Sequence, residues 1–196
     1  NPDLAIFEAE GHEWLPRVGE VCSAVSIENF VPPDERLNLI GSLTSRTEEA
    51  AAWIVLHAAA LERMWHSADL QAGETAACFV LMDTRLYAMA GQGLATTLYR
   101  TGGFTPCPKI DRMIQAGVGF RHVPLDELGD YAAGRFFIMY DSDNSDVESR
   151  EASRLLQNGI FHRYANRVHL LHSHWNFDDA WTRGKLVEAL PELLRA

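Results

Sequence analysis

Short apolar runs bounded by turn residues recur along the chain, and they predict buried strands. The run RFFIMY at 135–140 is almost continuously apolar, which is typical of a strand covered on both faces. The runs AACFVLM and RLYAMA are separated by Asp83 and Thr84, so we expect two strands joined by a turn there. The predicted strands cover residues 2–7, 21–27, 76–82, 85–90, 119–124, 135–140 and 167–172.

Apolar residues at three- and four-residue steps predict helices between these strands. Thr47, followed by two glutamates, begins the longest one, which runs to about residue 68. Its predicted apolar stripe consists of Trp53, Leu56, Ala60, Leu61 and Met64. Asp34 caps a shorter helix after a pair of prolines, and others are expected at 94–101, 125–131, 149–158 and 177–195. Strands that alternate with helices indicate an α/β fold with a mainly parallel sheet.

Composition narrows the possible functions. The chain has 196 residues, 47% of them hydrophobic, and no apolar run approaches the roughly 20 residues that a membrane span needs. Its 27 acidic and 17 basic residues give a net charge of -10, which argues against direct nucleic-acid binding. Cys22, Cys78 and Cys107 form no CxxC pair, and we interpret them as free thiols in a reducing compartment.

The most conspicuous polar cluster follows the last predicted strand. His169, His172 and His174 have a spacing that could suggest zinc. Residues three apart on a strand point to opposite faces, however, so His169 and His172 cannot share an ion unless the strand ends between them. We therefore interpret these histidines as a polar rim or as core residues with satisfied hydrogen bonds.

Other motifs carry weak signals. Residues 141–146, DSDNSD, lack the glycine and the glutamate of a calcium loop, and Asn144 or Ser145 is better placed to cap the next helix. The segment AGQGLATT at 90–97 could hold an anion at a helix start, but it lacks the third glycine of a dinucleotide site. No base is paired in sequence with Cys107, and G-x-S-x-G is absent, so we do not expect an enzyme.

The order of several segments resembles the iron-siderophore substrate-binding family of ABC importers. The segments are PDLAIF, ERLNLIGSL, EEAAAWI, RLYAMAGQGLATTLYRTGGF, FRHVPLDELGDYAAGRFFIMYDSD and NRVHLLHSHWNFDDAWTRGKL. Leu98-Tyr99 with Gly103-Phe104, and Arg167-Val168 with Trp175, match recurring positions of that family. The resemblance covers nearly the whole chain. The segment TRGKL is also similar to versions fused to AraC-type transcriptional regulators.

The resemblance implies a two-lobed, periplasmic-binding-protein-like fold whose N-terminal lobe begins before this sequence does. Residues 1–46 would be the end of that lobe, residues 47–70 a connecting helix, and residues 71–196 the C-terminal α/β lobe. The implied function is to bind an iron-siderophore-like chelate, without catalysis and without a cofactor. An ABC permease, or a fused DNA-binding domain outside this chain, would be the partner. The free cysteines and TRGKL slightly favour the cytoplasmic regulator over an extracytoplasmic lipoprotein.

The resemblance also implies where the ligand lies, because ligands of open α/β sheets bind beyond the carboxyl ends of the strands. Trp175 would offer a flat apolar wall, or else simply pack beneath the last helix. The predicted ligand-binding residues are Gln92, Gly93, Asp143, Asn144, His172, His174, Trp175 and Asn176.

Charge limits the ligand, since these loops contain no Lys or Arg. A tri-anionic ferric catecholate would need cations from the missing lobe, whereas a ferric hydroxamate would not; haem or a corrinoid are further options. The alternative function is a metal-dependent hydrolase that uses His169, His172 and His174 with Asp141 or Asp143. A scaffold without any ligand is the third possibility.

Overall fold

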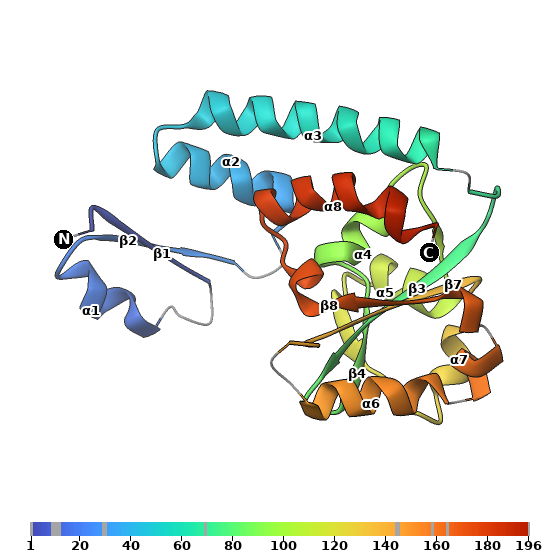
Figure 1. Ribbon diagram of the computed structural model, residues 1–196. Coiled ribbons are helices and arrows are strands. Elements are labelled where there is room, and N and C mark those ends of the chain that lie inside the picture. Colours follow the sequence, from blue (N-terminus) through green and yellow to red (C-terminus); the bar gives the residue numbers. More distant parts are fainter. Residues whose placement is uncertain are drawn as a thin grey trace. The chain divides into compact units, whose positions relative to one another are not determined.

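The chain forms two compact units, Asn1–Ile54 and Val55–Ala196, and the boundary between them falls within the helix α3 (Thr47–Ser67). The structure is a computed structural model that describes residues 2–8, 13–28, 31–68, 70–143, 146–157, 159–163 and 165–195 (Figure 1). In those residues, no helix has both the length and the apolar character of a membrane span. The division into residues 1–46, 47–70 and 71–196 stays a prediction, since α3 contributes to both units.

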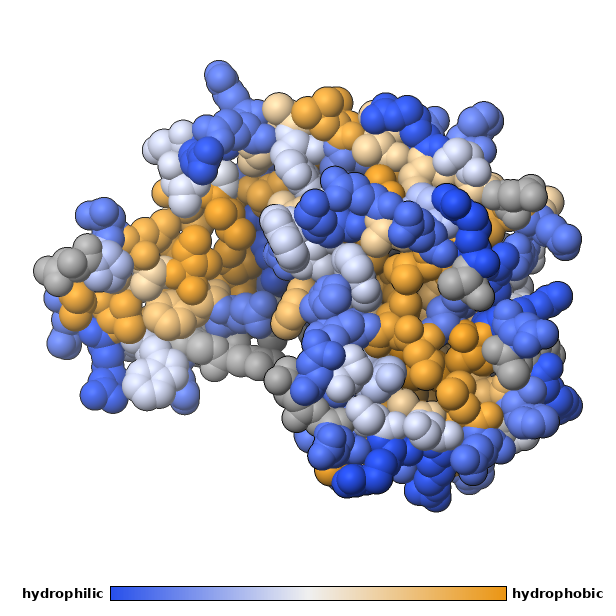
Figure 2. All heavy atoms as spheres, viewed as in Figure 1, coloured by the Kyte–Doolittle hydropathy of each residue, from blue (hydrophilic) through white to orange (hydrophobic). Residues whose placement is uncertain are grey.

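Unit 1 is built around one pair of parallel strands. Its elements are β1 (Leu4–Glu8), α1 (Leu15–Gly19), β2 (Ser23–Ile27), α2 (Pro33–Leu43) and the first part of α3. The strands pair in register from Leu4 with Ser23 to Glu8 with Ile27, and α1 lies in the connection that parallel strands require. Among its described residues, Ile27 and Ala50 are the buried hydrophobic ones, and orange patches lie over the part of unit 1 that holds β1 and β2 in Figure 2. The sequence pattern predicted both strands but not α1.

Unit 2 holds the larger sheet. Its strands are β3 (Thr75–Met82), β4 (Arg85–Met89), β5 (Thr105–Pro106), β6 (Phe120–His122), β7 (Arg135–Tyr140) and β8 (Val168–His172). Its α-helices after α3 are α4 (Gly93–Leu98), α5 (Pro108–Gln115), α6 (Asp146–Leu156), α7 (Gly159–Arg163) and α8 (Ala180–Leu193). Three 3₁₀ turns complete it: η2 (Leu128–Tyr131), η3 (Ala165–Arg167) and η4 (Ser173–Asn176).

The sheet is mainly parallel, as the sequence predicted, and among the described strands only β4 is reversed. The strand order is β6-β4-β3-β7-β8, with β5 beside the start of β3. The pairs β3–β5, β3–β7 and β7–β8 are parallel. The strand β4 pairs antiparallel with both of its neighbours, β3 and β6. The reason is the two-residue turn at Asp83 and Thr84, whose positive φ values of 49° and 65° are those of a tight hairpin. Because a hairpin reverses the chain, β4 pairs antiparallel with β3.

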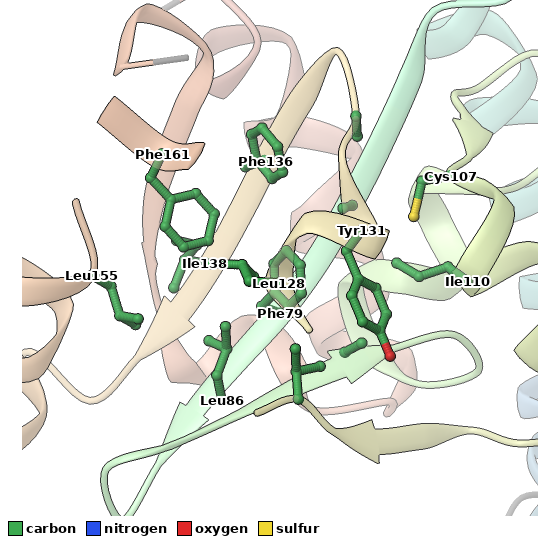
Figure 3. Packing of buried hydrophobic residues seen from close by; sticks show 14 of the residues in the cluster. Phe79, Leu86, Cys107, Ile110, Leu128, Tyr131, Phe136, Ile138, Leu155 and Phe161 are labelled. Carbon is green, nitrogen blue, oxygen red and sulfur yellow. The ribbon is translucent and has the colours of Figure 1, made fainter. Parts of the chain in front are cut away.

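Both faces of the central strands are covered, as the apolar run at 135–140 predicts. Along β3 and β7, Phe79, Phe136 and Ile138 face one layer, together with Phe161 of α7 (Figure 3). The alternate residues Cys78, Val80, Phe137 and Met139 face the other. This alternation follows from the two-residue period of a strand.

The second layer positions the polar turn that follows β8. It contains residues from the end of α3, from α4 and from α8, with Leu94, Leu98, Leu186 and Leu190 fully buried. In Figure 1, α8 and α4 lie on one side of the sheet, and α6 and α7 lie on the other. Trp181, near the start of α8, does not join this layer, since it is 71% exposed.

Candidate functional site

Two histidines form the centre of the candidate site: His172 ends β8, and His174 lies in the turn after it. The backbone N–H of His174 donates to Nδ1 of His172 at 3.0 Å, so this Nδ1 is an acceptor and the ring hydrogen of His172 is on Nε2. Nδ1 of His174 lies 2.8 Å from the same Nδ1 and can donate to it. In this arrangement Nδ1 of His172 is the shared acceptor of both contacts from His174.

Carboxylates lie on the other side of His172. Its Nε2 is 3.3 Å from an oxygen of Asp143 and 3.8 Å from an oxygen of Asp141. Burial lowers the pKa of His174, and the neighbouring His172 lowers it further, whereas Asp143 acts in the opposite direction. His174 is therefore uncharged at neutral pH.

The loop that holds these carboxylates is fixed by a residue that the sequence reasoning missed. Glu148, in the first turn of α6, accepts hydrogen bonds from the backbone N–H of Asp141 at 2.8 Å and of Asp83 at 3.2 Å. An acidic residue eight positions after the end of β7 was the available signal. The predicted site residue Asn144, and Ser145 as the alternative cap, lie outside the described residues.

Trp175 combines the two roles that the sequence left open. Its ring centroid is 4.3 Å from that of His174, and the ring also packs against the apolar layer beneath α8. The side chain is only partly buried. One part of the indole therefore stabilises the turn, and the remainder is accessible as an apolar surface.

A glycine allows α4 to approach this turn. Gly93 begins α4 with φ +50°, and a Cβ there would lie 2.5 Å from the backbone oxygen of Asn176. The side-chain Oδ1 of Asn176 is buried without a hydrogen-bond partner among the described residues. Gln92, the extended N-cap residue of α4, precedes the contact. This amide oxygen is therefore an acceptor whose hydrogen-bonding capacity is not used by the described residues.

The route by which Gly93 reaches the site differs from the prediction. We expected all three loops to follow the carboxyl ends of parallel strands. The segments at 141–143 and 173–176 do follow the parallel strands β7 and β8, but β4, which precedes α4, is antiparallel. The contact forms because the 3₁₀ turn η4 folds back against α4.

His169 does not join the other two histidines. It is 9% exposed, and its ring stacks on Phe137 with centroids 4.9 Å apart. It lies near the start of β8, three residues and therefore roughly 10 Å from His172 along the strand. Within the described residues, no group of three His, Cys, Asp or Glu side chains is arranged to hold a metal ion. The zinc set of the hydrolase alternative is thus not assembled there.

A buried cation also escaped the sequence reasoning. Arg183, in the first turn of α8, is 2% exposed, and its Nε lies 3.9 Å from an oxygen of Asp178. The ion pair holds this positive charge at the start of α8, just after the 3₁₀ turn η4. It can orient the start of α8, but its charge is offset by Asp178.

Unit 2 combines a sheet with the strand order β6-β4-β3-β7-β8 and a polar turn after the edge strand β8. Solved structures contain counterparts of this arrangement. The chain has the FhuD-like, periplasmic-binding-protein fold. No known family profile matches the sequence, and no curated protein matches it either.

Three of the similar structures illustrate the match. FhuD2 from Staphylococcus aureus with bound ferrioxamine B is 18% identical, with a TM-score of 0.76 over 98% of this chain and 76% of that chain. Staphylococcus aureus SirA complexed with staphyloferrin B is 14% identical, with a TM-score of 0.82 over 99% and 72%. The FhuD fold-family BSU3320 from Bacillus subtilis, described as a periplasmic binding protein component of a ferrichrome ABC transporter, is 17% identical, with a TM-score of 0.78 over 99% and 73%.

These structural similarities establish the fold, and at 14–18% sequence identity they establish the fold alone. The resemblance to iron-siderophore substrate-binding proteins that the sequence motifs indicate is thereby confirmed at the level of the fold, including its two-lobed, periplasmic-binding-protein-like class. The similarity to AraC-type regulators stays a prediction, and so do the ligand-binding roles of the individual residues.

Proposed function

We propose that this chain is a non-catalytic binding domain for an iron-siderophore-like chelate and that it acts in iron uptake. The observation that carries the proposal is the fold match to FhuD2 with ferrioxamine B and to SirA with staphyloferrin B. The polar turn of unit 2 supports it, because His174, Trp175 and Asn176 offer ring nitrogens, an apolar surface and an unsatisfied amide together. These groups can orient a ligand by hydrogen bonds.

The charge of the site favours a chelate with little negative charge. Asp141 and Asp143 lie beside His172, and the buried Arg183 lies near Asp178. Two like charges 5 Å apart repel by about 3 kcal/mol at an effective dielectric constant of 20. A neutral or cationic ferric hydroxamate avoids this repulsion, and a tri-anionic ferric catecholate does not.

The proposed role is that of an importer component. The description of BSU3320 as part of a ferrichrome ABC transporter supports this role over the cytoplasmic regulator that the sequence slightly favoured. The partner would then be an ABC permease, and the protein would work outside the cytoplasm.

Thermal unfolding with a panel of chelates tests the proposal. Ferrioxamine B represents the hydroxamates, and a ferric tris-catecholate represents the anionic chelates. A ligand at a hundred times its dissociation constant should add about 2.7 kcal/mol to the free energy of unfolding. We expect ferrioxamine B to raise Tm and the catecholate to have little effect.

Trp175→Ala should weaken binding of ferrioxamine B at least tenfold. Trp181→Ala is the matched control, because this indole is 71% exposed and is not a predicted site residue. The proposal fails if no chelate in the panel binds. Stoichiometric zinc in the purified protein would instead favour the hydrolase.

A further inference from the structure

A cavity of about 330 Å³ lies in unit 2 at the opposite ends of the strands from the candidate chelate site. Its walls include the first residue of β7, a residue near the start of β8 and the segment after α8. The lining residues among those described are Gln71, Glu74, Arg135, Asn166, Arg167, His169, Leu194 and Arg195. A second cavity of about 340 Å³ shares Arg135, Leu194 and Arg195 with it. Neither cavity contains a residue of the candidate chelate site.

Arg135 is held in a fixed orientation in both walls. Its Nε donates to Glu74 at 2.7 Å, and its Nη1 donates to the backbone oxygen of Leu194 at 2.8 Å. The guanidinium also lies over the ring of Phe104, 5.6 Å from the centroid. These contacts leave Nη2 without a partner among the described residues. A guanidinium fixed in this way loses little conformational entropy when it binds an anion.

The cavity is rich in positive charge. Arg167 and Arg195 are exposed at its edge, and Glu74, which pairs with Arg135, is the one carboxylate among the described lining residues. Three guanidinium groups therefore face one carboxylate. Guanidinium groups bind carboxylates and phosphates through paired, charge-assisted hydrogen bonds.

A buried ring nitrogen is a second sign of a polar occupant. His169 is 9% exposed, and its Nε2 has no hydrogen-bond partner in the described part of the chain. A buried nitrogen without a partner is unfavourable, and a polar ligand, or a water bound with it, can satisfy this nitrogen.

We propose that this cavity binds a small oxyanion, a carboxylate or a phosphate, between Arg135, Arg167 and Arg195. The volume of about 330 Å³ is at the lower end of the range for ligand sites, which suits a small acid better than a bulky ferric chelate. The site is separate from the one that the proposed function uses. Its occupation would fix the start of β7 and the end of α8 together.

Calorimetric titration with inorganic phosphate and with citrate tests the proposal, at constant ionic strength set by sodium chloride. We expect one of the two anions, or both, to bind at one site per chain, while chloride does not compete. Binding of phosphate alone assigns the site to phosphates, and binding of citrate alone assigns it to carboxylates. Absence of binding by both anions, or equal competition by chloride, overturns the proposal.

Arg167→Gln should weaken the binding of the anion at least tenfold while Tm stays unchanged, because this side chain is exposed and makes no ion pair with any residue that the structure describes. Arg163→Gln is the matched control, since it removes the same charge from an exposed residue that does not line the cavity. In addition, the ring ¹⁵N resonances of His169 should shift on titration with the anion. Equal losses in the two variants would show a non-specific charge effect and would refute the site. Neither result depends on whether ferrioxamine B binds.

Discussion

The contact between α4 and the polar turn predicts that Gly93→Ala destabilises unit 2. Gly93 has φ +50°, which costs about 1–2 kcal/mol for a residue with a Cβ. The new Cβ would also lie 2.5 Å from the oxygen and 2.6 Å from the Cα of Asn176, both of them backbone atoms. Overpacking of this kind costs a further 1–3 kcal/mol or so. We therefore expect a loss of about 2–5 kcal/mol in the free energy of unfolding.

Gly117→Ala separates the two contributions. Gly117 has a similar φ of +68°, but no atom lies within 4 Å of the position of a Cβ. This variant should lose only the backbone contribution, about 1–2 kcal/mol. Urea unfolding followed by circular dichroism measures both variants. If Gly93→Ala is no more destabilising than Gly117→Ala, α4 does not approach Asn176 as closely as described, and the arrangement of the candidate site is wrong.

Three further predictions concern the cap of α8, the core and a buried histidine. Asp179→Ala should cost about 1 kcal/mol in urea unfolding, because the carboxylate accepts hydrogen bonds from the N–H and the hydroxyl of Thr182; Asp179→Asn should retain part of this. Phe161→Ala should cost about 3–5 kcal/mol, since this ring is fully buried against the sheet; a loss below 1 kcal/mol would contradict the packing in Figure 3. Burial, and secondly the charge of Arg135, lower the pKa of His169. As the pH falls below about 6.5, His169 therefore binds a proton more readily in the unfolded chain than in the folded one. The free energy of unfolding should decrease as the pH falls from 7 to 5. An NMR titration in which His169 has a pKa above 6.5 would refute this.

Local pattern was enough to predict most of the elements. The seven predicted strands correspond to β1, β2, β3, β4, β6, β7 and β8, and the long helix runs from Thr47 to Ser67, close to its predicted bounds. These predictions succeed because a buried strand is short and apolar and an amphipathic helix repeats every 3.6 residues, whatever the rest of the fold. α5 was missed although Pro108 at its first turn is a typical start signal, and α1 has only five residues.

The candidate site depended much more on tertiary structure. The sequence placed Gln92, His172, His174, Trp175 and Asn176 in loops, which is a local property of polar residues after apolar strands. It could not show that Gly93 contacts Asn176 across 83 residues, or that Glu148 fixes the loop at Asp141, because such pairings depend on how helices pack on the sheet. Packing likewise separates His169 from His172. His169 lies near the start of β8 and stacks on Phe137, whereas His172 lies at the end of β8 beside Asp143. Residue pattern therefore determined which segments become strands and helices, and packing of those segments decided which side chains meet.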